Sequence, residues 1–416
     1  MVLYKMRVDD NAVVVGASHA AVQLVISLRQ NGWLGSITVI SEEPYMPYQR
    51  PPLSKAYLSG ILEEDRLALR AVETYKTLNV SFKLGCRVEH LDTENKILIL
   101  DSQEKISFTK LALCTGARVR RLDLPGGDLQ GVHYLRTMDD VKAIRQSAST
   151  SKRAVIIGGG YIGLEAAASL SKLGISVTVM ETEPRLLQRV ASQQVSEFYK
   201  RLHQEEGVEV KLNSMAVALH SGESGRNVGS VLCNDGAVIG ADMVIIGVGV
   251  IPNTELAGEA GLTIDNGIVV NEFAQTSHPD IVAAGDCTFH PNPLLKKSLR
   301  LESVPNASEQ AKAAAASLCG IKKAYSELPW FWSDQFDVKL QIAGISQGYT
   351  EAVVRGDTSI GRSFAVFYIK NQQIIAADCI NRPKDFMVAK KLISQQSTID
   401  VAALVDEGIE IKTLIN

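Results

Sequence analysis

The sequence predicts an α/β protein in which one strand–helix–strand (βαβ) unit occurs twice, followed by a smaller α+β domain. The first observation is a repeat, because the apolar strand at 12–15 ends in a glycine turn and the same arrangement recurs at 154–157. The second is that apolar strands of the first copy resume after the second copy, as at 281–284. The third is a change after about residue 325 to strands of antiparallel type. The second unit is therefore predicted to be inserted into the first.

The second copy carries a complete dinucleotide-binding pattern. Gly158, Gly160 and Gly163 have the spacing G-x-G-x-x-G, and Glu181 follows the next apolar strand. In a Rossmann-like fold the first glycine forms the turn, the second lets the backbone approach a pyrophosphate, and the third lets helix and strand pack closely. The diphosphate then lies at the helix N-terminus and the acid binds a ribose.

The first copy has small residues at two of the three glycine positions. It reads Gly16, Ser18 and Ala21, and Glu42 follows its second strand. Taken alone, this stretch is also compatible with an ordinary strand–helix turn. Its duplication in a matching context favours a second dinucleotide-binding domain, so we predict two Rossmann-like domains.

The expected boundaries follow from where each pattern starts and resumes. We predict a discontinuous first dinucleotide-binding domain at 1–116 and 245–325, a second dinucleotide-binding domain at 117–244, and a C-terminal α+β domain at 326–416. In the last domain we expect strands at 336–342, 363–369 and 373–380, followed by an amphipathic helix at 383–395.

Composition excludes several classes of protein. The apolar fraction of 46% and the charged fraction of 21% are those of a globular protein, and a net charge of −3 favours neither nucleic acid nor an anionic membrane. No apolar run approaches the roughly 18 residues of a membrane span, and the early strand leaves little room for a signal peptide. Six scattered cysteines with no C-x-x-C pair, and no paired histidines, predict a reducing, cytoplasmic location without a metal site.

Several longer stretches carry a family resemblance: Pro47-Tyr-Gln-Arg-Pro-Pro-Leu-Ser-Lys55, Tyr134-Leu-Arg-Thr137, Gly159-Gly-Tyr-Ile-Gly-Leu-Glu165, Arg300-Leu-Glu-Ser-Val-Pro-Asn-Ala-Ser-Glu-Gln310 and Trp330-Phe-Trp-Ser-Asp-Gln335. Together they resemble the putidaredoxin-reductase family, the ferredoxin reductases of bacterial aromatic-ring dioxygenase and cytochrome P450 systems. That family is similar in turn to the FAD/NAD-linked reductases of the glutathione-reductase type. The resemblance covers essentially the whole chain.

The resemblance implies FAD in the first domain, NADH in the second, and a [2Fe–2S] ferredoxin or a rubredoxin as electron acceptor. Disulfide reductases of this architecture have a cysteine pair in the first domain. Here the corresponding region contains Arg50-Pro-Pro-Leu-Ser-Lys55, so electrons are expected to leave directly from the flavin. This would be an NADH-dependent ferredoxin reductase.

The βαβ pattern and the resemblance together imply two sets of cofactor contacts. The FAD contacts are Gly16, Ser18, His19, Ala20, Glu42, Arg50, Lys55, Val88, Thr115, Gly116, Arg136, Asp286, Val304 and Trp332. The NAD contacts are Gly158, Gly160, Tyr161, Ile162, Gly163, Glu165, Glu181, Arg189 and Gly249. We interpret His19 as a packing or flavin-side contact and not as an acid–base catalyst.

Three residues are candidates for the chemistry. The resemblance implies that Lys55 lies at the flavin N5 edge, that Glu165 pairs with it, and that Trp332 covers the flavin. Each also has a plain structural interpretation: a surface cation in a proline-rich loop, a helix-terminal acid favoured by the dipole, and an aromatic core residue.

The charged residues predict which nicotinamide cofactor is used, NADH or NADPH, and where a protein partner could dock. Glu181 favours NADH because a carboxylate pairs with the 2′-hydroxyl and repels a 2′-phosphate, although Arg185 and Arg189 nearby could attract one. A cluster of basic residues could dock an acidic ferredoxin, or could be only a solvated face; its members are Lys296, Lys297 and Arg300.

Two other functions use the same folds. A flavin oxidase, monooxygenase or quinone reductase would make peroxide from NADH without a protein acceptor or reduce a quinone. A redox-sensing flavoprotein would react slowly with NADH and keep a long-lived charge-transfer complex. Turnover with an added ferredoxin separates both from a ferredoxin reductase.

Overall fold

The computed structural model describes residues 7–223 and 225–415. Residues 1–6 and 416, which the predicted first and third domains include, lie outside the described residues. The chain folds into two compact units. The first consists of Met1–Gln49, Asp65–Arg118 and Ile251–Pro329, and the second of Arg50–Glu64, Val119–Val250 and Trp330–Asn416. The finer division into three domains stays a prediction.

The first unit is built on a five-stranded sheet in the order β20-β7-β1-β2-β3, with every neighbouring pair parallel. Its strands are β1 (Asn11–Val15), β2 (Ser36–Ser41), β3 (Val80–Leu84), β7 (Lys110–Leu113) and β20 (Ile281–Ala283). In β1, residues Ala12, Val13 and Val14 are fully buried. A strand in a parallel sheet is covered on both faces, which is why a continuous apolar run forms it.

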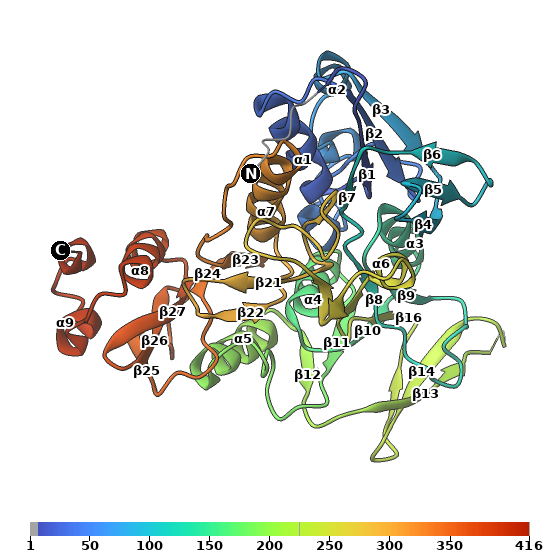
Figure 1. The fold of residues 1–416 in the computed structure, drawn as a ribbon. Helices are drawn as coiled ribbons and strands as arrows, with labels where there is room; N and C mark the ends of the chain where they lie inside the picture. The colour runs from blue at the N-terminus through green and yellow to red at the C-terminus, as the bar shows by residue number, and fades with distance from the viewer. Residues whose placement is uncertain (1–6, 224, 416) are drawn as a thin grey trace. The chain divides into compact units, whose positions relative to one another are not determined.

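Successive residues of β1 face opposite sides of this sheet. Ala12 and Val14 pack in one core with α1 (His19–Gln30) and α7 (Val304–Leu318), which contact each other (Figure 1). Val13 and Val15 pack in a second core on the other face. Helix α7 begins at Val304, because Ser303 is its N-cap and accepts a hydrogen bond from the Asn306 N–H.

The remaining elements of the first unit are short. An antiparallel sheet contains β4 (Val88–Asp92), β5 (Ile97–Leu100) and β6 (Lys105–Ser107). A four-stranded sheet contains β18 (Ile264–Asp265), β19 (Gly267–Val269), β21 (Thr288–Asn292) and β22 (Lys297–Leu299). The helices are α2 (Val72–Thr77), α6 (Glu255–Glu259) and the 3-10 turn η2 (Glu64–Leu67). A separate two-stranded sheet pairs β8 (Ala117–Val119) with β17 (Val250–Pro252).

The second unit repeats the parallel sheet, in the order β12-β11-β10-β16-β9. Its strands are β9 (Val132–Tyr134), β10 (Arg153–Ile157), β11 (Ser176–Met180), β12 (Glu209–Lys211) and β16 (Met243–Ile246). Its helices are α3 (Met138–Ala148), α4 (Tyr161–Lys172) and α5 (Gln193–Glu205), and η1 (Pro51–Ser54) belongs to the same unit. A three-stranded antiparallel sheet adds β13 (Ala216–Ser221), β14 (Val228–Cys233) and β15 (Val238–Gly240).

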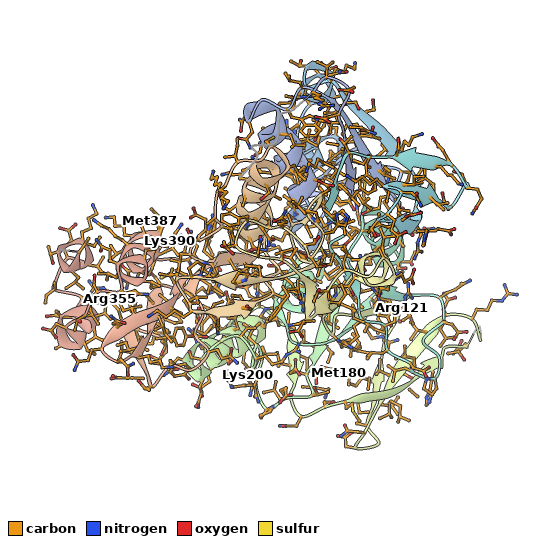
Figure 2. The ribbon with its side chains drawn as sticks, in the orientation of Figure 1. Arg121, Met180, Lys200, Arg355, Met387 and Lys390 are labelled. Atoms are coloured by element: carbon orange, nitrogen blue, oxygen red, sulfur yellow. The ribbon has the colours of Figure 1, made fainter. Side chains whose placement is uncertain are left out.

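The C-terminal part of the second unit is an antiparallel sheet in the order β23-β24-β27-β26-β25. The strands are β23 (Trp330–Gln335), β24 (Val338–Gly344), β25 (Glu351–Gly356), β26 (Phe364–Lys370) and β27 (Gln373–Ile380), followed by α8 (Pro383–Gln395), α9 (Val401–Val405) and η3 (Ile411–Leu414). The predicted strand at 373–380 and helix at 383–395 have these bounds, whereas β23 and β25 were not predicted. Arg355, labelled in Figure 2, donates to the carbonyls of Leu404, Asp406 and Ile409 and so secures the segment that contains α9.

The predicted fold class is confirmed: two parallel-sheet Rossmann-like folds and a C-terminal antiparallel sheet. Within residues 7–223 and 225–415, no helix combines the length and apolar character needed to cross a bilayer. In the same described part, no three His, Cys, Asp or Glu side chains gather as metal ligands.

Candidate cofactor sites

In the first unit, predicted FAD contacts gather at the carboxyl edge of the parallel sheet. Gly16 follows β1, Glu42 follows β2, and Asp286 follows β20. The strands end in register, since Val15 pairs with Leu113 of β7 and with Ile40 of β2. Ligands of open α/β sheets bind at this edge, so the topology brings together residues distant in sequence.

The turn after β1 requires a glycine. Gly16 has a φ of +103°, and a Cβ on it would lie 2.2 Å from the carbonyl oxygen of Cys114 at the end of β7. Ser18 occupies the N-cap position of α1, but its side chain makes no capping hydrogen bond to the N–H groups of the helix. Ala21, at the third position of the motif, is buried and has the small side chain that close helix–strand packing needs.

Two residues that sequence reasoning did not select hold this edge in place. Asn253 donates its side-chain N–H to the carbonyl oxygen of Thr115 at 2.8 Å, and Thr115 donates its hydroxyl to the Asn253 carbonyl oxygen at 2.7 Å. The side-chain oxygen Oε1 of Gln310, in α7, accepts hydrogen bonds from the Gly285 N–H and the Thr288 hydroxyl, both at 2.9 Å. Gln310 ends one of the stretches that carry the family resemblance, but only the fold shows which turns Asn253 and Gln310 brace.

The other predicted FAD residues of the first unit lie at element boundaries. His19 and Ala20 begin α1, Val88 begins β4, Gly116 follows Thr115 with a φ of +64°, and Val304 begins α7. The Glu42 side chain is 72% exposed, with an oxygen 3.6 Å from Arg87. An exposed carboxylate at a strand end is accessible to a ribose hydroxyl.

In the second unit the glycine motif has three distinct physical roles. Gly158 has a φ of +115°, and a Cβ there would lie 2.5 Å from the Gly247 carbonyl oxygen. A Cβ on Gly163 would lie 2.2 Å from the Gly158 carbonyl oxygen, so α4 packs closely on its strand. A Cβ on Gly160 would meet nothing within 4 Å, so the space beside this helix N-terminus is open to a ligand.

The acidic residue after β11 is built into the same turn. Glu181 accepts the Gly159 N–H at 2.8 Å and the Glu183 N–H at 3.0 Å. Arg185 donates to the carbonyl oxygens of Ala191 and Gln188 and to the Ser196 hydroxyl, so its guanidinium is engaged within its own loop. Arg189 is exposed.

The other predicted NAD residues differ in exposure. Ile162 is 40% exposed, and Gly249 has a φ of +101°. The Tyr161 ring lies 5.0 Å from the Phe331 ring, and its hydroxyl is buried without a hydrogen-bond partner in the described part of the chain. Burial raises the pKa of that hydroxyl. Tyr161 therefore packs within the second unit.

Lys55 and Glu165 form a buried ion pair in the second unit. The Lys55 ammonium lies 2.7 Å from Glu165 Oε2, and the two side chains are 18% and 4% exposed. Glu165 also accepts hydrogen bonds from the hydroxyls of Ser54 at 2.5 Å and Ser333 at 2.6 Å. A buried carboxylate is tolerated only with such partners, so this is an assembled ionic site.

Elements far apart in sequence supply this cluster. Lys55 follows η1, Glu165 lies in the first turns of α4, and Ser333 is in β23. The Ser169 hydroxyl, one turn further along α4, donates to the Ser54 carbonyl oxygen at 2.7 Å and fixes the η1 segment against the helix. The pairing of Lys55 with Glu165 was predicted, whereas Ser54, Ser169 and Ser333 were not selected.

Besides Lys55, three predicted FAD contacts lie in the second unit. Arg50 donates to the Arg136 carbonyl oxygen at 2.9 Å, so these two residues are brought together. Trp332 is half-buried, with its ring 5.7 Å from that of Trp330. Lys390 of α8, labelled in Figure 2, lies 5.2 Å from the Trp330 ring. The two tryptophans belong to one aromatic cluster.

Comparison with known proteins shows which family has this architecture. The family model described as pyridine nucleotide-disulphide oxidoreductase matches residues 10–311, and a model described as reductase C-terminal matches residues 330–415. The chain belongs to the pyridine nucleotide-disulphide oxidoreductase family. The C-terminal match covers the antiparallel sheet that begins with β23.

Individual relatives match along nearly the whole chain. Putidaredoxin reductase CamA of Pseudomonas putida is 40% identical over 413 residues, which is 99% of this chain and 98% of that protein. Ferredoxin–NAD(P)(+) reductase fdr of a Sphingomonas species is 41% identical over 94% of each chain. The crystal structure of the covalent putidaredoxin reductase–putidaredoxin complex has a TM-score of 0.95 and 39% identity, covering 98% and 99% of the two chains.

The members of this family use FAD and NAD(H), and so does this chain. The residues fit these groups on structural grounds. Each Rossmann-like fold has a positive-φ glycine followed by a helix with no side-chain capping hydrogen bond at its N-terminus, where the N-cap residues are Ser18 and Gly160. The acidic residue that a ribose requires follows the second strand in both folds, as Glu42 and Glu181.

This family member has no cysteine pair for disulphide chemistry. All six cysteines are free thiols, and all except Cys86 are buried. Burial raises the pKa of Cys114 and Cys287, and raises that of Cys319 to about 11. A protonated, buried thiol is a poor nucleophile, so these cysteines are packing residues.

Proposed function

We propose that this oxidoreductase is an NADH-dependent ferredoxin reductase that supplies single electrons to a [2Fe–2S] ferredoxin of an oxygenase system, either a Rieske dioxygenase or a cytochrome P450. When bound, FAD takes two electrons together from NADH and releases them singly. The observation that carries the proposal is the buried ion pair between Lys55 and Glu165, which lies on the helix that the complete NAD motif opens. Relatives named as reductases of ferredoxins, matching end to end, support the acceptor.

We propose that Lys55 holds a positive charge for the flavin as it gains negative charge. Glu165 orients the ammonium through a 2.7 Å contact, and its own charge is stabilised by two hydroxyls. A preorganised charge in a buried site stabilises a developing charge more than the same group in water does. Trp332 is proposed to cover the flavin.

We propose that the remaining predicted residues hold the cofactors. The glycine turns and helix N-termini would receive the two pyrophosphates, Glu42 and Glu181 the adenosine riboses, and Asp286 a ribityl hydroxyl. The Arg185 guanidinium is engaged by the carbonyl oxygens of Ala191 and Gln188, so we propose that Glu181, against the exposed Arg189 alone, discriminates NADH from NADPH. The proposal includes Arg50 and Arg136 as FAD contacts.

A ferredoxin docking surface is proposed at Lys296 and Lys297. Both side chains are exposed, whereas Arg300 is hydrogen-bonded to Glu302, which reduces its net contribution to a basic surface. Reversing both lysines to glutamate should raise the KM for ferredoxin roughly tenfold and abolish its salt dependence. The matched control reverses Lys322 and Lys323, another adjacent pair of exposed lysines in the same unit. Equal effects of the two reversals would exclude this surface.

Rapid mixing tests the function. We expect NADH to reduce the FAD faster than NADPH, and the reduced protein to pass electrons to [2Fe–2S] ferredoxins in steady turnover. Rubredoxin as the better acceptor would change the partner but not the chemistry. Stoichiometric peroxide from NADH, or quinone reduction, without a carrier protein would make the chain an oxidase or quinone reductase. Slow reduction with a lasting charge-transfer band and no ferredoxin turnover would make it a sensor.

A further inference from the structure

A chain of buried hydrogen bonds leads away from Glu165 on the side opposite Lys55. The Ser333 hydroxyl lies 2.6 Å from Glu165 Oε1, and Gln335 Nε2 lies 3.2 Å from that hydroxyl. The Gln335 side-chain oxygen lies 2.8 Å from His203 Nε2. Ser333, Gln335 and His203 are each at most 1% exposed. A polar chain of this kind in a core is costly unless every link is satisfied.

The protein's local structure explains how the links meet. Ser333 and Gln335 are two residues apart in β23, so their side chains leave the same face of the strand. His203 is in the last turn of α5, and its ring also packs edge-on against Phe336. Apolar residues normally occupy a buried strand face, so two polar residues there indicate a specific role.

The direction of each bond follows from an ionised Glu165. A carboxylate only accepts, so the single hydroxyl hydrogen of Ser333 points to Glu165 and its oxygen must accept from Gln335. This orients the Gln335 amide, leaving its oxygen toward His203. His203 must then carry its hydrogen on Nε2. All three donors therefore point toward Glu165.

The state of His203 agrees with this direction. Burial lowers its pKa to about 4, so the ring is neutral near pH 7 and has one N–H. Its Nδ1 is buried and has no hydrogen-bond partner among residues 7–223 and 225–415. The single N–H of the His203 ring is therefore on Nε2, where the Gln335 side-chain oxygen accepts its hydrogen bond.

Two buried tyrosines lie near Glu165, and its charge contributes to raising the pKa of both hydroxyls, which keeps them neutral. Tyr161 of α4 and Tyr199 of α5 are buried and interact electrostatically with both Glu165 and Asp378 of β27. Their hydroxyls make no hydrogen bond to Glu165, because both lack a partner among the described residues. The charge on Glu165 therefore depends on Lys55, Ser54 and the chain that ends in Ser333.

We infer that Ser333, Gln335 and His203 are positioning residues that hold the Glu165 carboxylate in place and directed at Lys55. The inference rests on the proposed role of that pair in the reduction of FAD by NADH. The chain orients and does not conduct protons, since the Gln335 amide has no readily exchanged proton to pass along the chain. Aligned donors polarise one another and strengthen the bond at the carboxylate.

The tautomer of His203 tests the direction without any measurement of activity. We expect ¹⁵N NMR of histidine-labelled protein at pH 7 to show His203 protonated at Nε2, with the signal assigned by its loss in His203→Gln. If Glu165 carried the proton, every bond would reverse and Nδ1 would be protonated. An Nδ1–H tautomer in the unaltered protein would therefore overturn the inference.

Single-turnover reduction of FAD by NADH tests the positioning. Ser333→Ala should slow reduction roughly tenfold with the NADH affinity unchanged, and Ser333→Thr, which keeps the hydroxyl, should restore most of the rate. Gln335→Met should have a smaller effect, about threefold, because it breaks the chain one link further away. The matched control is Ser192→Ala, which removes the N-cap of α5 and should lower stability without changing the rate.

A double-mutant cycle separates this inference from the proposed function. Glu165→Ala should slow reduction, and adding Ser333→Ala to it should slow it no further, because Ser333 acts through Glu165. If Glu165→Ala leaves the rate unchanged, the proposed role of the ion pair fails. If Glu165→Ala slows reduction but Ser333→Ala matches the unaltered protein, the ion pair stands and the positioning chain fails.

Discussion

The two βαβ units place the same turn at the same register, but the helix after each turn meets different surroundings. In both units the first strand pairs with the second from its first residue, as Asn11 with Ser36 and Arg153 with Ser176. In both, a positive-φ glycine approaches the carbonyl oxygen of a neighbouring segment, as Gly16 and Gly158 do. The sheet edge that binds a dinucleotide is therefore repeated almost unchanged.

The two βαβ units differ in the helix that follows the glycine turn, which is α1 in the first and α4 in the second. Two residues after the third motif position, α1 has Gln23, which donates to Ser27 in its own helix, whereas α4 has the buried Glu165. α1 packs against α7 through an alanine-rich interface, and α4 contacts η1 and β23, which bring Lys55 and Ser333. The comparison teaches that the two units share the pattern to which we assign cofactor binding, and that the packing partners of one helix supply the residues to which we assign the chemistry.

The largest expected effect on stability comes from removing Lys55, the partner of Glu165 in the buried ion pair. Lys55→Ala leaves Glu165 buried without its counter-ion, so the free energy of unfolding should fall by about 3 kcal/mol. Adding Glu165→Gln, which gives α4 the amide that α1 has, should recover most of this loss. Urea unfolding followed by tryptophan fluorescence in a Trp33→Phe background measures it, since Trp330 and Trp332 both lie in the second unit. An unchanged midpoint in Lys55→Ala would contradict the ionic site.

The third motif position should also distinguish the two folds. Gly163→Ala places a Cβ 2.2 Å from the Gly158 carbonyl oxygen and should cost about 2–3 kcal/mol and weaken NADH binding. The first fold already has a methyl group there, so Ala21→Gly should cost only about 1 kcal/mol. Thermal unfolding and NADH titration of both variants give the comparison. Equal losses would show that the two helices pack equally closely.

The second unit should also respond to pH through Asp378. Burial raises the pKa of this carboxyl to about 7, and the hydrogen bond from Tyr368 lowers it in part. An unfolded aspartate titrates near pH 3.9, so between about pH 4 and 7 the folded state holds more protons and the free energy of unfolding falls as pH rises. Asp378→Asn should remove this fall, gaining about 2 kcal/mol at pH 7.5 relative to pH 5. Urea unfolding of both proteins at both pH values measures this change. The same change in the free energy of unfolding with pH in the unaltered protein and in Asp378→Asn would contradict the prediction.

The smallest expected effects come from replacing Glu181 and Glu42, the two acidic residues that we propose bind the adenosine riboses. Glu181→Ala should raise the KM for NADH about tenfold and reduce the preference over NADPH, because the 2′-hydroxyl loses its acceptor. It should also loosen the turn, since the Gly159 N–H loses its bond. Glu42→Ala should weaken FAD retention by a similar factor while leaving turnover with NADH at saturating FAD unchanged. Equal catalytic efficiency with NADH and NADPH in the unaltered protein would refute the role of Glu181.

The fold was largely predictable because its signals are local. A continuous apolar run, a positive-φ glycine and a strand-end acid are each visible within a few residues, as around Gly16 and Gly158. The C-terminal strands β23 and β25 were not predicted, because Trp330–Gln335 mixes aromatic and polar residues and lacks a clean alternation. The pairing of Lys55 with Glu165 was available only through family resemblance, since no spacing rule links residues so distant.

The sequence by itself determined the two cofactor-binding edges, since turn geometry and strand burial depend on each residue and its near neighbours. Only the tertiary structure decided how Glu165 is satisfied. Its partner Ser333 is 168 positions away, and Gln335 is 132 positions from His203. A hydrogen bond depends on the positions of atoms to within a fraction of an ångström. Those positions come from the packing of η1, α4, α5 and β23, which no local pattern records.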